Sequence, residues 1–264
     1  LRRSTARASW STMHTGSAFW ATAAKAQSDA RIMFAGKDAA TTLDLLGALA
    51  EAFNGKKNYD AAVKVLEDAL ARAETTPFNA DDVAKQLAAN DDSPLYDAVA
   101  RVKKWYATGL LNAESFSIDK NTLVAFMQNN MASVVFMSLS DHRNIERAAI
   151  EPFTSIYFPS DYPAATRSFV APVISAVPVS RNKKANALVQ HLATTEAQEN
   201  LSRATGLAPV LAQCRTPDRQ ADDARYWVAA TNAPLAGLSR EAALSDEQLQ
   251  ALGIALGVLI RFGK

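Results

Sequence analysis

The sequence has a single cysteine, Cys214, among its 264 residues. An internal disulfide is therefore excluded, and no Cys/His spacing resembles that of a metal site. Histidine is also scarce, because only His14, His142 and His191 are present, in unrelated contexts. No serine lies in a G-x-S-x-G nucleophile elbow. These absences lead us to expect no catalytic residues, no metal-binding residues and no cofactor, so the chain is not predicted to be an enzyme.

An excess of charge of either sign is missing as well. Lys and Arg number 28 against 27 Asp and Glu, so the formal net charge is +1. Such a balance provides no broad basic field for nucleic acid or anionic lipid. The longest apolar stretch, at about 252–260, is far shorter than the roughly 20 apolar residues that a membrane-spanning helix needs. We therefore expect neither nucleic acid nor the bilayer interior as a partner.

Three acidic pairs remain as candidates for metal or acid–base chemistry. Each lies where the pattern predicts the start of a helix, and the helix dipole favours carboxylates at that end. We therefore interpret all three as capping residues: Asp81-Asp82, Asp91-Asp92 and Asp222-Asp223.

Helix is the dominant secondary-structure pattern. Apolar residues recur at spacings of three and four in four segments, which predicts amphipathic helices there. Thr195 with Gln198 fits a capping box, and Ser245 before two acidic residues predicts the start of a final helix that runs to Phe262. The four periodic segments are 39–53, 59–73, 95–106 and 188–201.

Strand patterns are fewer and shorter. Four segments are rich in β-branched or aromatic residues, namely 31–35, 132–137, 155–158 and 169–179. Strands that alternate with helices predict a helix-rich α/β fold with a sheet core covered by helices. The long helical stretch at 41–106 is too much for one βαβ unit, so it predicts a separate helical subdomain.

The segment at 195–210 carries the most specific motif. Thr195-Glu196-Ala197-Gln198-Glu199 is followed by Ala204-Thr205-Gly206 and then by Pro209-Val210. This arrangement resembles the C-terminal signature of family 1 extracellular solute-binding proteins, where a helix with a "SPEAQ"-like start leads into an "ATGxxPV" turn near the ligand cleft. Five further segments are similar to the family's pattern and follow in its order: 15–25, 34–46, 104–111, 123–145 and 181–182.

The resemblance implies a two-lobe architecture of the type II periplasmic-binding-protein kind. Residues 1–35, 112–168 and 181–264 would form mainly the C-terminal lobe and the lobe crossings. Residues 36–111 would form the helical subdomain, and 169–180 the strand that crosses between lobes, in a different sheet from 132–137. The family's pattern begins upstream of Leu1, so we expect an incomplete N-terminal lobe and weak or no sugar binding by this chain alone.

The resemblance also implies a function. A protein of this family binds a small-molecule solute, here a sugar, outside the cytoplasm and delivers it to the permease subunits of an ABC importer. It would work in the periplasm or outside the cell, either free or held at the membrane by an upstream lipid anchor. Two alternatives stay open: an α/β hydrolase or transferase, and a helical adaptor that binds protein partners.

Two turns are the predicted ligand contacts, Gly36-Lys37-Asp38 and 138–143. Each follows a short strand and leads into a helix, and ligands gather at the carboxyl ends of strands in open α/β sheets. The alternative is that Asp38 caps the helix that begins near Ala39 and that Asp141 and Arg143 form a surface pair. The candidate ligand-binding residues are Lys37, Asp38, Ser138, Ser140, Asp141, Arg143, Tyr162 and Ser175.

Aromatic side chains that stack on sugar rings are expected in this family. At the corresponding positions this sequence has Gly16, Ala40, Ser140 and Val177. The aromatic residues that could replace the missing rings are Trp20, Tyr157, Tyr162 and Trp227.

Overall fold

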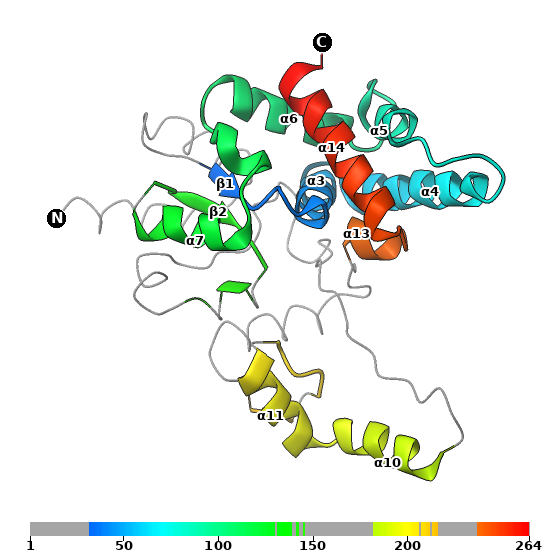
Figure 1. Cartoon of the computed structure of the whole chain (residues 1–264), viewed down its shortest axis with the longest axis vertical. Helices are drawn as coiled ribbons and strands as arrows, with labels where there is room; N and C mark the ends of the chain where they lie inside the picture. The colour runs from blue at the N-terminus through cyan, green and yellow to red at the C-terminus, as the bar shows by residue number, and fades with distance from the viewer. Residues whose placement is uncertain are drawn as a thin grey trace.

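The computed structural model describes residues 32–129, 131–138, 141–142, 145, 182–205, 207–211, 213–215 and 237–263. These residues are rich in helix and contain a small sheet, in agreement with a helix-rich α/β class. No helix within these ranges is both long enough and apolar enough to cross a bilayer. The elements, shown in Figure 1, are β1 (Ile32–Phe34), α3 (Ala39–Asn54), α4 (Lys56–Ala73), α5 (Ala80–Ala88), α6 (Tyr96–Ala107), the 3-10 helix η1 (Ala113–Phe116), α7 (Lys120–Gln128), β2 (Val134–Phe136), α10 (Lys183–Leu192), α11 (Thr195–Thr205), α13 (Leu238–Glu241) and α14 (Asp246–Phe262).

Within the described residues the sheet consists of β1 and β2, which run parallel although about 100 residues separate them. Ile32 lies opposite Val134 and Phe34 lies opposite Phe136. The strands predicted at 31–35 and 132–137 are thus confirmed. Because the two strands are parallel, their carboxyl ends meet at one edge of the sheet. The strands predicted at 155–158 and 169–179 lie outside the described residues, and with them the predicted lobe crossing.

The main core is helical and centres on α3. Leu43, Leu46 and Leu49 of this helix are fully buried, and α4, α6, α13 and α14 pack around it. Figure 1 shows α14 crossing α3, so the last helix of the chain packs against the helices near its start. Each buried leucine contributes about 1.5–3 kcal/mol relative to an exposed one. The division of the chain into a subdomain at 36–111 and two lobes stays a prediction.

The close crossing of α14 over α3 depends on Gly253. A Cβ at this position would lie 2.5 Å from the Cβ of Ala39, the first residue of α3. Since real side chains do not approach so closely, only glycine lets the two helices meet here. Gly253 therefore places α14 directly beside the turn that connects β1 to α3.

The helices at the predicted segments 39–53, 59–73 and 95–106 are confirmed, with ends that differ by a few residues. The final helix also begins as predicted, because Ser245 forms a capping box with Gln248 at the start of α14. The helix start predicted at Thr195 is confirmed, and the periodic segment 188–201 is divided between α10 and α11 with a break between them. The reason is a cap inside that segment.

Thr194, and not Thr195, provides that cap. Its Oγ1 accepts a hydrogen bond from the N–H of Ala197 at 3.3 Å. The predicted partner, Gln198, instead donates to the carbonyl of Leu192 and accepts from the N–H of Val210. Gln198 therefore forms hydrogen bonds with the segment before α11 and with the turn after it. The predicted Thr195–Gln198 capping box is wrong.

The acidic pairs have two different outcomes. Asp81 and Asp82 lie in the first turn of α5, as expected. Asp91 and Asp92 do not lie at a helix start, because they occupy the turn before α6, where the N–H of Asp92 donates to the side chain of Asn90. The interpretation of this pair as helix caps is wrong, while Asp222-Asp223 lies outside the described residues.

Candidate functional site at the carboxyl edge of the sheet

Both predicted ligand-binding turns begin at the same edge of the sheet. Residues 36–38 follow β1 and lead into α3, and Ser138 follows β2 and leads into a helical turn at Asp141-His142. The expectation that each turn joins a strand to a helix is therefore confirmed. The parallel register of β1 and β2 brings the two turns together, although the sequence places them far apart.

The first turn is held by hydrogen bonds inside the protein. The N–H of Gly36 donates to the carbonyl of Ser115 at 2.7 Å, and the N–H of Lys37 donates to the carbonyl of Ile118 at 3.1 Å. A Cβ on Gly36 would lie 2.6 Å from the same Ser115 oxygen, so this approach requires glycine. The backbone donors of Gly36 and Lys37 are thus occupied, and the turn offers a ligand its side chains.

Asp38 caps α3, as the alternative interpretation expected. Its Oδ1 accepts a hydrogen bond from the N–H of Ala40 at 3.0 Å. The side chains of Lys37 and Asp38 are both exposed. Capping occupies one carboxylate oxygen of Asp38, and a carboxylate can accept further hydrogen bonds through the other. The two roles of Asp38, cap and ligand contact, are therefore compatible.

The second turn is organised by Ser138. Its Oγ accepts from the N–H of Asp141 at 3.0 Å and donates to Asp141 Oδ2 at 2.7 Å. Asp141 also accepts from Lys120 Nζ, which lies 3.2 Å from Oδ1 and 3.0 Å from Oδ2. Lys120 thus pairs with Asp141, and the expected pair with Arg143 stays a prediction because Arg143 lies outside the described residues.

The start of α7 lies between the two turns. Asp119 caps this helix by accepting from the N–H and the hydroxyl of Thr122, each at 2.9 Å, and these hydrogen bonds hold the pKa of its carboxyl below the ordinary value. Lys37 Nζ lies 4.0 Å from Asp119 Oδ2. Alternating charges therefore extend from one turn to the other in a charged row made of Lys37, Asp119, Lys120 and Asp141.

Asp119 and Lys120 are not among the residues predicted from the sequence. A helix-start signal was available, because an aspartate precedes the apolar positions Leu123 and Met127 at helical spacing. That signal predicts a cap, but it does not predict that the cap lies beside two turns from other parts of the chain. This juxtaposition depends on the pairing of β1 with β2.

A small pocket of about 130 Å³ adjoins the first turn and is closed on its other side by α14. The ring of Phe116 forms an apolar wall, and Gly253 and Gly257 of α14 line the pocket without side chains. The cations Lys37 and Arg261 and the amide of Gln250 supply polar groups. We call this cavity the Lys37 pocket, and it is lined by Gly36, Lys37, Ala39, Phe116, Gln250, Gly253, Ile254, Gly257 and Arg261.

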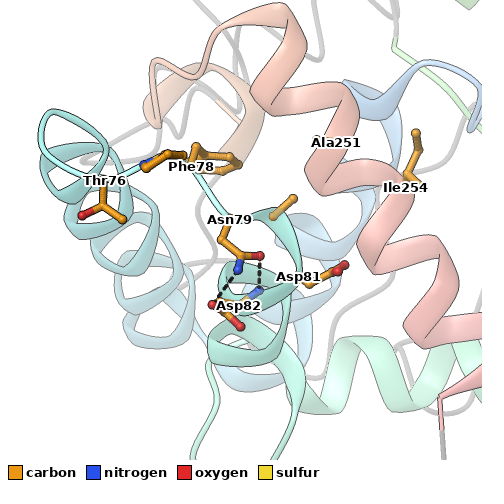
Figure 2. Close-up of a pocket in the computed structure, with 9 residues that line it drawn as sticks. Thr76, Phe78, Asn79, Asp81, Asp82, Ala251 and Ile254 are labelled. Carbon is orange, nitrogen blue, oxygen red and sulfur yellow. Dashed lines mark hydrogen bonds between the residues drawn. The ribbon is translucent and has the colours of Figure 1, made fainter.

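A second, wider depression lies on the other side of Ile254 and is shown in Figure 2. It is an open groove of about 740 Å³ between residues 76–82 and α14. Two of its polar side chains bond to each other, since Asn79 caps α5 by accepting from the N–H of Asp82 and also donates to the Asp82 carboxylate. The groove offers a partner the apolar surface of Phe78, Ala251 and Ile254 together with the side chains of Thr76 and Asp81.

The other predicted site residues lie outside the described part of the chain. The structure thus brings Lys37, Asp38, Ser138 and Asp141 to one edge, while the second half of the predicted set stays a prediction. Within the ranges that the structure describes, no three His, Cys, Asp or Glu side chains gather in a way that could hold a metal ion. The undescribed candidates are Ser140, Arg143, Tyr162, Ser175, Trp20, Tyr157 and Trp227.

No family model matches the chain, and comparison with curated proteins and with solved structures gave no match either. The features that bear on function are therefore the sequence motifs and the geometry of the edge where β1 and β2 end.

Proposed function

We propose that this protein captures a small polar solute, a sugar or a molecule of similar size, outside the cytoplasm and delivers it to the permease subunits of an ABC importer. Two observations support this proposal. The order of sequence segments resembles that of family 1 extracellular solute-binding proteins. The observation that carries the proposal is that two parallel strands, β1 and β2, end in turns at one edge, where the charged row and the Lys37 pocket lie side by side around Lys37.

The chemistry of this edge suits a polyhydroxylated solute. A sugar hydroxyl both donates and accepts, so it binds well where donors and acceptors alternate. The ammonium groups of Lys37 and Lys120 donate, and the carboxylates of Asp38 and Asp141 accept. Open α/β sheets bind ligands at the carboxyl ends of their strands, which is where these side chains lie. Capture needs no chemical step, because closure of two lobes around the solute would supply the signal that a permease recognises.

Calorimetric titration of the native protein with a panel of mono- and disaccharides tests this proposal. The informative variants are Asp38→Asn and Asp141→Asn, because asparagine removes the negative charge and keeps one side-chain oxygen, for the cap at position 38 and for the hydrogen bond from Ser138 at position 141. Solute capture predicts weaker binding with a nearly unchanged melting temperature in both variants. Unchanged affinity in both would mean that the two carboxylates serve only the fold, and the edge would no longer be the site.

One observation favours a second candidate, a protein-interaction adaptor. The outer face of α14 exposes Ile254, Val258 and Phe262, with 56%, 44% and 69% of these side chains accessible. Exposed apolar side chains in a row, next to the groove of Figure 2, are typical of surfaces that bind other proteins. A stable complex with a soluble protein that Ile254→Glu abolishes, together with no stabilisation by any small solute, would favour the adaptor over the importer component.

A further inference from the structure

We propose that the Lys37 pocket makes the site selective for solutes that carry an acidic group, a carboxylate or a phosphate, over their neutral counterparts. This inference rests on the proposed function and specifies its substrate class. It comes from the charges around the pocket, from the way Arg261 is held, and from the size of the space.

The charges that line the pocket have one sign. Lys37 and Arg261 are cationic, and none of the nine lining residues is acidic. Among the described residues, the carboxylate within ion-pair distance of Lys37 is that of Asp119, whose Oδ2 lies 4.0 Å from Nζ, the outer limit of an ion pair. Both side chains are more than half exposed, so this pair is weak. Lys37 therefore keeps most of its capacity to bind an anion.

Arg261 is positioned without being neutralised. Its Nε donates to the carbonyl of Gly257 at 3.1 Å, and its guanidinium carbon lies 5.5 Å from the ring centre of Phe116 and 5.2 Å from that of Phe262. Within the described residues, no carboxylate lies within ion-pair distance of it. One guanidinium nitrogen lies 3.9 Å from where a Cβ of Gly257 would be, which places that end of Arg261 beside this glycine. An arginine that is oriented but unpaired is suited to bind an oxyanion.

The dimensions of the pocket limit what can enter. Its volume of about 130 Å³ is below the range of roughly 300–1,000 Å³ that is usual for drug-sized ligands, so it takes a small solute or one group of a larger one. Ala39 at the start of α3 also lines it, and the amino end of a helix carries partial positive charge. The neighbouring Asp38 opposes this potential, but it is not part of the lining and its Oδ1 accepts from Ala40. The Phe116 ring supplies an apolar wall for the C–H groups next to the acidic group.

The test compares hexoses with the matching uronic acids and with hexose 6-phosphates, titrated into the native protein by calorimetry at fixed ionic strength. For the hexose whose derivatives bind most tightly, we expect the uronic acid or the 6-phosphate to bind about tenfold more tightly than the neutral hexose. Lys37→Gln and Arg261→Gln should each weaken binding of the acidic solute about three- to tenfold more than binding of the neutral one, because glutamine removes the charge and keeps a hydrogen-bond donor for a hydroxyl. Lys64→Gln is the control, because it removes the same charge from α4, away from the pocket. Arg261→Lys, which keeps the charge, should retain part of the preference if Arg261→Gln disturbs folding.

Inorganic phosphate provides a second readout that does not need the right sugar. Thermal stabilisation by phosphate should be smaller in Lys37→Gln than in the native protein and in Lys64→Gln, a comparison that cancels the general stabilisation by phosphate salts. If neutral sugars bind as well as acidic ones and both variants bind like the native protein, selectivity is overturned while solute capture stands. If no sugar or sugar acid binds but phosphate stabilises Lys37→Gln less than Lys64→Gln, the anion site stands and the proposed function fails. If nothing binds and phosphate does not discriminate, both are overturned.

Discussion

The carboxylate of Asp44 on α3 accepts two hydrogen bonds from Ser239, which follows it by 195 residues. The backbone N–H of Ser239 donates to Oδ1 and its hydroxyl donates to Oδ2, each at 2.9 Å. Asp44 of α3 thus binds the start of α13, and these hydrogen bonds connect the C-terminal part of the chain to the helical core. Tyr59 of α4 adds to the attachment, since its buried hydroxyl donates to Glu241 at 3.2 Å.

Removal of the Asp44 carboxylate should loosen this attachment. In Asp44→Ala the N–H and the hydroxyl of Ser239 lose their acceptors in a partly buried place, which costs about 2–3 kcal/mol. Asp44→Asn keeps an acceptor and should cost clearly less. Urea denaturation of both variants measures the difference. Equal stability of the alanine and asparagine variants would show that the hydrogen bonds to Ser239 contribute nothing.

The pH dependence of the same pair follows from burial. Burial raises the pKa of the Asp44 carboxyl above its ordinary value of 3.8, although the hydrogen bonds from Ser239 lower it in part. The folded state therefore holds this proton more tightly than the unfolded state, so the contribution of Asp44 is most favourable at low pH and declines as pH rises through the folded pKa. The stability of Asp44→Asn relative to the native protein should accordingly improve as the pH increases from about 4 toward neutrality. A difference that is the same at every pH would contradict the raised pKa.

The two glycines of α14 should respond in opposite ways to alanine. In Gly253→Ala the new Cβ would meet Ala39 at 2.5 Å, so the helices must separate, at a cost of about 1–3 kcal/mol. In Gly257→Ala the closest contact is Phe116 Cδ1 at 3.6 Å, an ordinary distance, and the better helix propensity of alanine should add about 0.5–1 kcal/mol. Because Gly257 lines the Lys37 pocket, its alanine variant should also bind solute more weakly. Denaturation and calorimetry on the same samples separate the two effects.

The cap of α14 offers a local test of stability. Ser245→Ala removes the side-chain oxygen that accepts from the N–H of Gln248, which should cost about 1 kcal/mol. Ser245→Asp keeps an acceptor at the cap and should stay close to the native stability. A lower melting temperature in the alanine variant alone is the expected result, whereas equal losses in both would mean that the capping box is not what stabilises the start of α14.

Much of the local structure could be predicted from the sequence because its causes are local. The strands β1 and β2, the helices α3, α4, α6 and α14 and the cap at Asp38 follow from residue spacing and from signals a few residues long. The choice between Thr194 and Thr195 could not be predicted, because either residue can cap a helix. The outcome depends on Gln198, which bonds to Leu192 on one side and Val210 on the other.

The site could be predicted only in part, for a related reason. The turns at Lys37 and Ser138 were identifiable, since each ends a strand. The contribution of Lys120 to the second turn, and of Arg261 to the pocket beside the first, depends on helices from other parts of the chain that tertiary packing brings to the sheet edge. No periodicity or short motif in the sequence contains that information.

The most direct test of solute capture is a crystal structure of the native protein with the tightest-binding member of the sugar and sugar-acid panel. The account predicts that the solute lies at the carboxyl ends of β1 and β2, within hydrogen-bond distance of Lys37 or Asp38 from the first turn and of Lys120 or Asp141 beside the second. An acidic solute should also place its carboxylate or phosphate between Lys37 and Arg261. A solute that occupies another surface, such as the groove beside Phe78 and Ile254, with the charged row facing only solvent, would contradict the account.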